Sequence, residues 1–362
     1  MKNLSIIGLI NLSERKIEKS MKRMSEQIGK WMKFLFVMFL LCGFTTESRA
    51  QNYQKVVDLN GRWKFSIGDN AKWANPNFND SNWERVDVPS AWENQGFHGY
   101  DGYAWYRTNF NNPNVSKTQS LYLKLGNIDD VDEVFINGKK IGQTGSFPPH
   151  FSTAYTSNRV YNIPANILLE KNVIAVRVYD DVGEGGIVYG DVSIVLDRDA
   201  IPVDIDLQGE WRFKTGRYAH ENLQAIDSWD RIIVPGHWEN QGYKNYDGYA
   251  CYALDFKADE KLIVERMVLV LGKIDDIDQV IVNGVLVGQS GEFDPSTVRQ
   301  YSDSYQQVRG YYLPPNLIKK GQKNRIVVRV FDAMEGGGIY TGSIGLISQD
   351  HYIKYWNKRR RR

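Results

Sequence analysis

Apolar and polar residues alternate along most of this chain, as they do in strands that bury one face. In residues 59–65 (LNGRWKF) the tryptophan and the phenylalanine share one face, and the charged side chains lie on the other. A similar alternation at 134–136 runs into Asn137-Gly138, a pair that tolerates positive φ and favours a type I′ hairpin. Beyond residues 1–50, no segment shows sustained helical periodicity. The pattern therefore predicts many short antiparallel strands joined by turns.

The same pattern of residues occurs twice along the chain. Residues 127–145 (NIDDVDEVFINGKKIGQTG) recur as residues 273–291 (KIDDIDQVIVNGVLVGQSG), and the strand that begins at Leu59 recurs from Leu207. A repeat of this length is a whole domain rather than one unit of a solenoid. We expect an all-β fold of two tandem antiparallel β-sandwiches, one in residues 51–198 and one in residues 199–350.

The two ends of the chain differ in composition from residues 51–350, which we call the body. Residues 1–50 contain a basic segment, the apolar run 34–44 and small residues before Gln51, as in an export signal with an overlong n-region. The apolar run is too short for an ordinary membrane-spanning helix. We expect a secreted or periplasmic protein with no stable membrane span after signal cleavage. Residues 351–362 carry six Lys/Arg and no acid, and we expect a solvated basic tail there.

Charge and cysteine content narrow the choice of partners. The formal net charge is +2, but the leader carries nine Lys/Arg against four Asp/Glu and the tail carries only bases, so the body is acidic. An acidic body repels phosphate backbones, and we expect no nucleic acid partner. Of the two cysteines, Cys42 lies in the leader. Cys251 therefore has no disulfide partner in the mature chain, and we expect it to be a small core residue.

Several motifs together resemble a known family. They are L-x-G-x-W-x-F at 59–65, V-P-x-x-W-E at 88–93, Trp105-Tyr106-Arg107, the doubled stretch at 127–145, and a glycine loop that follows Asp180. In this order they resemble the N-terminal sugar-binding domain of family-two glycoside hydrolases, the group of β-galactosidases, β-glucuronidases and β-mannosidases. The resemblance covers residues 57–348, twice over. It implies two galactose-binding-like jelly rolls that recognise carbohydrate.

The resemblance also implies what the chain lacks. Those hydrolases place two catalytic glutamates in a TIM barrel of about 250 residues. Two sandwiches already occupy the chain outside its leader, so we expect no such barrel and no catalytic residue. Loop acids such as Glu93 and Asp101 could in principle gather in pairs, but acids of this kind commonly shape turns. If the chain is an enzyme, it is a glycoside hydrolase of the β-galactosidase type.

Sugar binding suits the residue types of the loops. A pyranose has an apolar face that stacks on aromatic rings, and its hydroxyls bind carboxylates, amides and arginine. We assign Trp63, Trp92, Trp211 and Trp238 to the core. The alternative for the loop tyrosines is that they only pack the loops. The candidate carbohydrate-binding residues are His98, Tyr100, Asp101, Tyr103, Glu184, Tyr243, Tyr246, Asp247, Tyr249 and Glu335.

A metal is a further expectation that comes from the resemblance. No cofactor is predicted as required, and the absence of a His/Cys cluster disfavours zinc. Jelly rolls of this type often hold a structural calcium on carboxylate and carbonyl oxygens. The acids that could serve here are Asp129, Asp130, Asp132, Asp180 and Asp181.

These features predict a secreted, non-catalytic carbohydrate-binding protein that is accessory to polysaccharide degradation, with an oligosaccharide or polysaccharide as its partner. The first alternative is a fragment or reduced form of a family-two hydrolase that needs a separate catalytic chain. The second alternative is a structural or protein-interaction sandwich.

Overall fold

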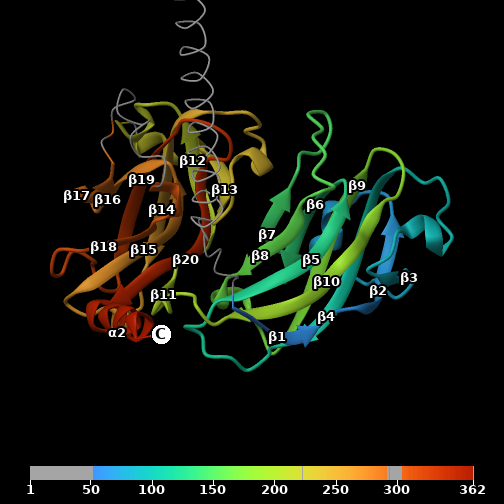
Figure 1. Ribbon diagram of the computed structural model, residues 1–362, viewed down its shortest axis with the longest axis horizontal. Coiled ribbons are helices and arrows are strands. Elements are labelled where there is room, and N and C mark those ends of the chain that lie inside the picture. Colours follow the sequence, from blue (N-terminus) through green and yellow to red (C-terminus); the bar gives the residue numbers. More distant parts are fainter. Residues whose placement is uncertain (1–51, 222, 292, 294–303, 362) are drawn as a thin grey trace, which may run out of the picture. The chain divides into compact units, whose positions relative to one another are not determined.

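The computed structural model describes residues 52–221, 223–291, 293 and 304–361 (Figure 1). The proposed export leader, residues 1–50, lies outside this part of the chain. Among the helices that are described, none has the length and apolar character needed to cross a membrane. Most of the regular structure is antiparallel strand, arranged in four sheets that form two sandwiches, which confirms the predicted fold class.

The first sandwich pairs a four-stranded sheet, in the order β1-β10-β5-β8, with a six-stranded sheet, in the order β3-β2-β4-β9-β6-β7. Three 3-10 turns connect its strands: η1 (Ala71–Ala74), η2 (Trp92–Gln95) and η3 (Ala165–Ile167). The strands are β1 (Tyr53–Asp58), β2 (Gly61–Ile67), β3 (Glu84–Val88), β4 (Gly102–Asn111), β5 (Leu121–Asp129), β6 (Val131–Ile136), β7 (Lys139–Thr144), β8 (Asn158–Ile163), β9 (Lys171–Asp180) and β10 (Gly186–Asp197).

The second sandwich has the same strand order, with each strand ten numbers further on: β11-β20-β15-β18 and β13-β12-β14-β19-β16-β17. Its 3-10 turns are η4 (Ala219–Glu221), η5 (Leu223–Ser228), η6 (Glu239–Gln241), η7 (Glu260–Leu262) and η9 (Ser304–Gln306). Its strands are β11 (Ile205–Asp206), β12 (Gly209–Thr215), β13 (Asp230–Val234), β14 (Gly248–Lys257), β15 (Met267–Asp275), β16 (Ile277–Val282), β17 (Val285–Ser290), β18 (Val308–Tyr312), β19 (Lys323–Asp332) and β20 (Gly338–Ser348).

Tryptophans anchor the core of each sandwich. The four that were assigned to the core are at most 1% exposed, which confirms that assignment. In β2 the indole N–H of Trp63 donates to the carbonyl of Leu59 at 2.8 Å, and Trp211 makes the same bond to Leu207 at 2.8 Å. Each indole therefore buries a large apolar surface and still satisfies its one polar group.

The Asn-Gly pairs form the expected hairpins. Asn137 and Gly138 join β6 to β7 with φ values of 51° and 77°, and Asn283 and Gly284 join β16 to β17 with values of 49° and 83°. Positive φ at both central residues defines the type I′ turn, which matches the twist of the paired strands. The side-chain amide of Asn137 also donates to the carbonyl of Ile167 at 2.9 Å, so the turn is tied to the loop before β9.

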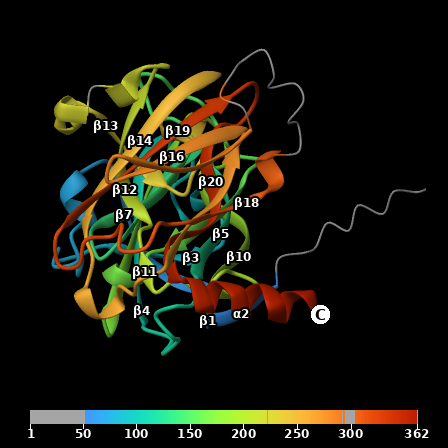
Figure 2. The same cartoon turned by 90° about the vertical axis from the view of Figure 1, so that its left-hand side faces the viewer.

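The basic C-terminal segment is helical, which differs from the solvated tail expected from its composition. Helix α2 (Gln349–Arg360) lies next to the C-terminus (Figure 2). It starts at the N-cap Ser348, whose hydroxyl accepts from the backbone N–H of His351 at 3.3 Å. Tyr352 is buried in a cluster with Val268 and Ile347 of the second sandwich. The charge run concealed this anchor, because a few aromatic residues on one side of a helix suffice to dock it.

Cys251 lies in β14 and is 1% exposed, as expected for a core residue. It packs in a cluster with Ile226 and Trp229, and burial raises the pKa of its thiol to about 12. Because the thiolate is the reactive form, we expect the native Cys42→Ser variant to resist a chromogenic thiol reagent at pH 8. The same variant should react at once in guanidinium chloride. Rapid labelling of the native protein would contradict this burial.

Candidate functional site

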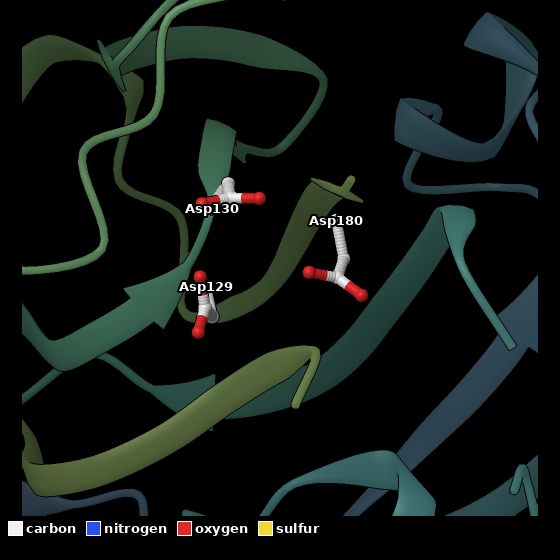
Figure 3. A group of neighbouring side chains, drawn as sticks. All are labelled: Asp129, Asp130 and Asp180. Atoms are coloured by element: carbon white, nitrogen blue, oxygen red, sulfur yellow. The ribbon is translucent and has the colours of Figure 1, made fainter. Parts of the chain in front are cut away.

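Three aspartates converge at one end of the first sandwich. Asp129 ends β5, Asp130 follows it through a cis peptide bond, and Asp180 ends β9 (Figure 3). One carboxylate oxygen from each lies within 4.8 Å of the others. Two oxygens bound to the same Ca²⁺ are at most about 5 Å apart, because each is 2.3–2.6 Å from the ion. The spacing therefore fits a calcium ion.

Asp180 is the most buried residue of this cluster. It is 0% exposed, and neither of its carboxylate oxygens has a hydrogen-bond partner among the described residues. Burial, followed by the charges of Asp130 and Asp129, raises the pKa of Asp180 to about 7. A buried carboxylate without a partner is costly, and a bound cation would offset that cost. The donor set thus fits a hard divalent cation by its chemistry as well as by its spacing.

The second sandwich repeats the cluster. Asp275, Asp276 and Asp332 place one carboxylate oxygen each within 4.8 Å of the others, and Asp332 is 0% exposed with one oxygen unpartnered among the described residues. Burial is the main cause that raises the pKa of Asp275 to about 8 and that of Asp332 to about 7. In both acidic clusters, 129/130/180 and 275/276/332, the converging carboxylates therefore repel one another.

Asp132 and Asp181 do not belong to the cation-binding set that the sequence suggested. Asp132 is 0% exposed and accepts from Nε of Arg159 at 2.8 Å and from the hydroxyl of Tyr161 at 2.6 Å. Its carboxylate is committed to a buried ion pair. Asp181 is exposed and donates its backbone N–H to Asp130 at 3.0 Å, so it positions a cluster member instead.

Three of the candidate loop tyrosines are used in packing. The hydroxyls of Tyr100 and Tyr246 donate to the carbonyls three residues further on, at 2.7 and 2.6 Å. The hydroxyl of Tyr243 donates to Asp230 at 2.5 Å, and its ring meets Phe213 edge-on with centroids 4.6 Å apart. For these three residues the loop-packing alternative describes what the structure shows.

The candidate acids are exposed and surround the clusters. The charge of Asp101 contributes to the raised pKa of Asp180, that of Glu184 to the raised pKa of Asp129, and that of Asp247 to the raised pKa of Asp332. His98 is exposed, and so is Glu335, which has a positive φ of 70°. Asp101, Glu184 and Asp247 therefore act electrostatically on the acidic clusters but are not among their converging carboxylates.

Tyr103 belongs to a different arrangement, on the outer face of the six-stranded sheet. Its ring is nearly parallel to that of Phe147, at an interplanar angle of 6° and a centroid distance of 6.0 Å. The guanidinium of Arg177, from β9, lies 4.7 Å from the Tyr103 centroid and 4.3 Å from that of Phe147. Tyr179 packs beside Tyr103 at 4.8 Å. We call these four residues the first aromatic–arginine face.

The second sandwich has a matching set, the second aromatic–arginine face, made of Tyr249, Phe293, Phe331 and Arg329. The ring of Tyr249 lies 4.5 Å from that of Phe331 and 5.5 Å from that of Phe293. The guanidinium of Arg329 lies 4.4 Å from the Phe293 centroid. All four side chains are half-buried. Sequence reasoning found the two tyrosines but missed the arginines, whose only signal was their alternation with apolar residues along a strand.

Comparisons with known proteins support a carbohydrate-related origin. Residues 68–184 match the family model described as the second all-beta domain of beta-galactosidase. Residues 68–184 therefore resemble an accessory all-β domain of the family-two glycoside hydrolases, in agreement with the resemblance that the motifs carry. The match begins just after β2 and includes the first acidic cluster and the first aromatic–arginine face.

The chain is also similar to individual curated proteins and to solved structures. A β-glucuronidase of Formosa agariphila is 30% identical over 155 residues, which cover 38% of this chain and 15% of that protein. A β-galactosidase of Bacteroides ovatus is 28% identical over 133 residues, which cover 33% of this chain and 15% of that protein. The solved structure of a Bacteroides uniformis β-glucuronidase superposes with a TM-score of 0.34 and 17% identity, covering 78% of this chain and 28% of that one. The chain thus spans a small part of its curated relatives.

Proposed function

We propose that this chain binds carbohydrate without cleaving it, through the aromatic–arginine faces of both sandwiches. The observation that carries the proposal is the double occurrence of a guanidinium packed against aromatic rings on an outer sheet face. Rings of this kind stack on the apolar face of a pyranose, while the guanidinium donates to its hydroxyls. Two such faces in one chain would raise the avidity for a polymer if both reach it.

The burial of Asp180 and Asp332 argues against a catalytic role for these two carboxylates. A glycosidase needs two carboxyl groups about 5–9 Å apart on either side of a reachable sugar. The carboxylates that approach one another in the described residues include Asp180 and Asp332, which are 0% exposed. A sugar ring has no access to such groups, whereas a small ion needs only their oxygen atoms.

We predict that Tyr103→Ala combined with Tyr249→Ala weakens glycan binding about fivefold or more, since each stacked ring contributes about 0.5–1.5 kcal/mol. The measurement is retardation in native gels that contain plant or host polysaccharides. Tyr189→Ala is the matched control, because Tyr189 is 58% exposed but lies in the four-stranded sheet. Unchanged retardation of the double variant would contradict the proposal that the aromatic–arginine faces bind the sugar.

A catalytic role in company with another chain is the second candidate. It is favoured by the names of the relatives, which are a β-glucuronidase and a β-galactosidase. Release of nitrophenol from aryl glycosides by the purified chain would overturn the non-catalytic proposal. Release that appears only after a separate barrel-containing chain is added would support this second candidate.

Export to the periplasm or the medium is a further part of the proposal. It is supported by the basic and apolar pattern of residues 1–50.

Calcium belongs to the proposal as a structural ion. Asp129, Asp130 and Asp180 would hold one ion, and Asp275, Asp276 and Asp332 a second. The ion would neutralise the converging carboxylates and join the end of one strand to that of another in the opposite sheet. We assign it no step in recognition, because the aromatic–arginine faces are built from other residues.

A further inference from the structure

Among the residues that the structure describes, the two aromatic–arginine faces differ in charge. In the first face Arg177 pairs with Asp69 at 2.6 Å and with Glu133 at 3.0 Å. Glu133 lies directly opposite Arg177 across the β6–β9 pair. These two carboxylates counter the charge of the guanidinium, and Lys140 balances the remaining negative charge through its own contact with Glu133 at 2.8 Å.

Both acids are replaced in the second face. Gln279 lies directly opposite Arg329 across the β16–β19 pair, where the first sandwich has Glu133. Arg217 follows the glycine after β12, where the first sandwich has Asp69 after β2. The guanidinium of Arg217 lies 5.3 Å from the Tyr249 centroid, so it also borders this face. A neutral side chain thus replaces one acid, and a positively charged side chain replaces the other.

Arg329 is consequently short of partners. It donates from Nη1 to the side-chain oxygen of Gln279 at 2.5 Å and from Nη2 to the carbonyl of Arg217 at 3.5 Å. Within the described part of the chain, its Nε is buried without a hydrogen-bond partner, and neither Arg329 nor Arg217 forms an ion pair there. Burial first, and then the charge of Arg217, lower the pKa of Arg329. Glu221 on η4 acts in the opposite direction but forms no ion pair with it.

We infer that the second aromatic–arginine face selects an anionic sugar, whose acidic group pairs with Arg217 and Arg329 while its ring stacks on Tyr249 and Phe293. The inference rests on the proposed function and names its substrate class. A carboxylate is the expected group, because a planar guanidinium binds it through two parallel hydrogen bonds. The first face, with its arginine already neutralised, suits a neutral sugar.

The test compares three polymers on the full chain: polygalacturonate, a sulfated galactan and a neutral galactan. We expect polygalacturonate to bind at least about tenfold more tightly than the neutral galactan at low ionic strength, as one charge-assisted contact allows. Added salt should reduce the difference. Tighter binding of the sulfated galactan than of polygalacturonate would support an anion site and assign it to sulfate.

The decisive variant is Arg217→Asp with Gln279→Glu, which gives the second face the acids of the first. We expect the ratio of polygalacturonate to neutral-galactan affinity to fall about tenfold or more. Arg231→Gln is the matched control, because Arg231 is a 59% exposed arginine of β13 outside the face. If the double variant fails to fold, Arg217→Gln alone should lower the same ratio. An unchanged ratio in a folded variant, or neutral binding without any preference, overturns this inference alone. Failure to bind any glycan overturns the proposed function.

Discussion

Adding calcium to the metal-free protein is expected to raise its melting temperature by about 5–10 °C at a hundredfold excess over the dissociation constant. The reason is the repulsion between the carboxylates of the two acidic clusters. Asp180 and Asp332 are 0% exposed and poorly partnered, and other carboxylate oxygens lie within 4.8 Å of them. A cation that binds only the folded state relieves this repulsion and stabilises that state. Differential scanning calorimetry with calcium and with a chelator measures the shift.

The combined variant Asp180→Asn with Asp332→Asn should lose the calcium shift. In the presence of chelator it should melt no lower than the original protein, because it lacks two buried charges that have no cation. Asp181→Asn is the matched control, since Asp181 is exposed and contributes its backbone N–H to the cluster. A calcium shift that survives in the combined variant would remove both clusters as the binding sites. Sensitised terbium luminescence offers a second readout of occupancy.

Asp132→Ala is expected to destabilise the protein by about 3–5 kcal/mol, because it leaves a buried arginine without its counter-charge. Arg159 and Asp132 both have side chains that are 0% exposed and are joined at 2.8 Å. The other guanidinium nitrogens donate to backbone carbonyls, including those of Ala154 and Ser157 at 2.6 Å each. Those carbonyls satisfy its N–H groups but carry no full charge. Urea unfolding measures the loss of free energy.

The matched control for this prediction is Asp87→Ala. Asp87 pairs with Arg62 at 3.6 Å, but both side chains are more than two-thirds exposed, and such pairs contribute about 0–1 kcal/mol. Equal losses in the two variants would mean that Arg159 finds other compensation, for example water. Asp278 and Arg309 form the same pair in the second sandwich at 2.7 Å, with side chains at most 3% exposed. Asp278→Ala should therefore repeat the result there.

Much of the fold follows from local rules that act within a few residues. The Asn137-Gly138 pair sets positive φ whatever surrounds it, so the hairpin was predictable. Alternation placed Trp63 and Phe65 on the buried face, because side chains in a strand point alternately to its two sides. The doubling of the domain was visible for the same reason, since equal patterns produce equal elements.

The roles of the acids and arginines were decided by tertiary structure. Asp129, Asp130 and Asp132 are close in sequence, yet the first two face a cluster with Asp180 while the third pairs with Arg159 inside the protein. The partners come from β8 and β9, which no local pattern connects to this segment. The strands, their turns and the faces of their side chains follow from local sequence patterns. Which charges meet depends on which strands become neighbours, and long-range packing alone establishes that.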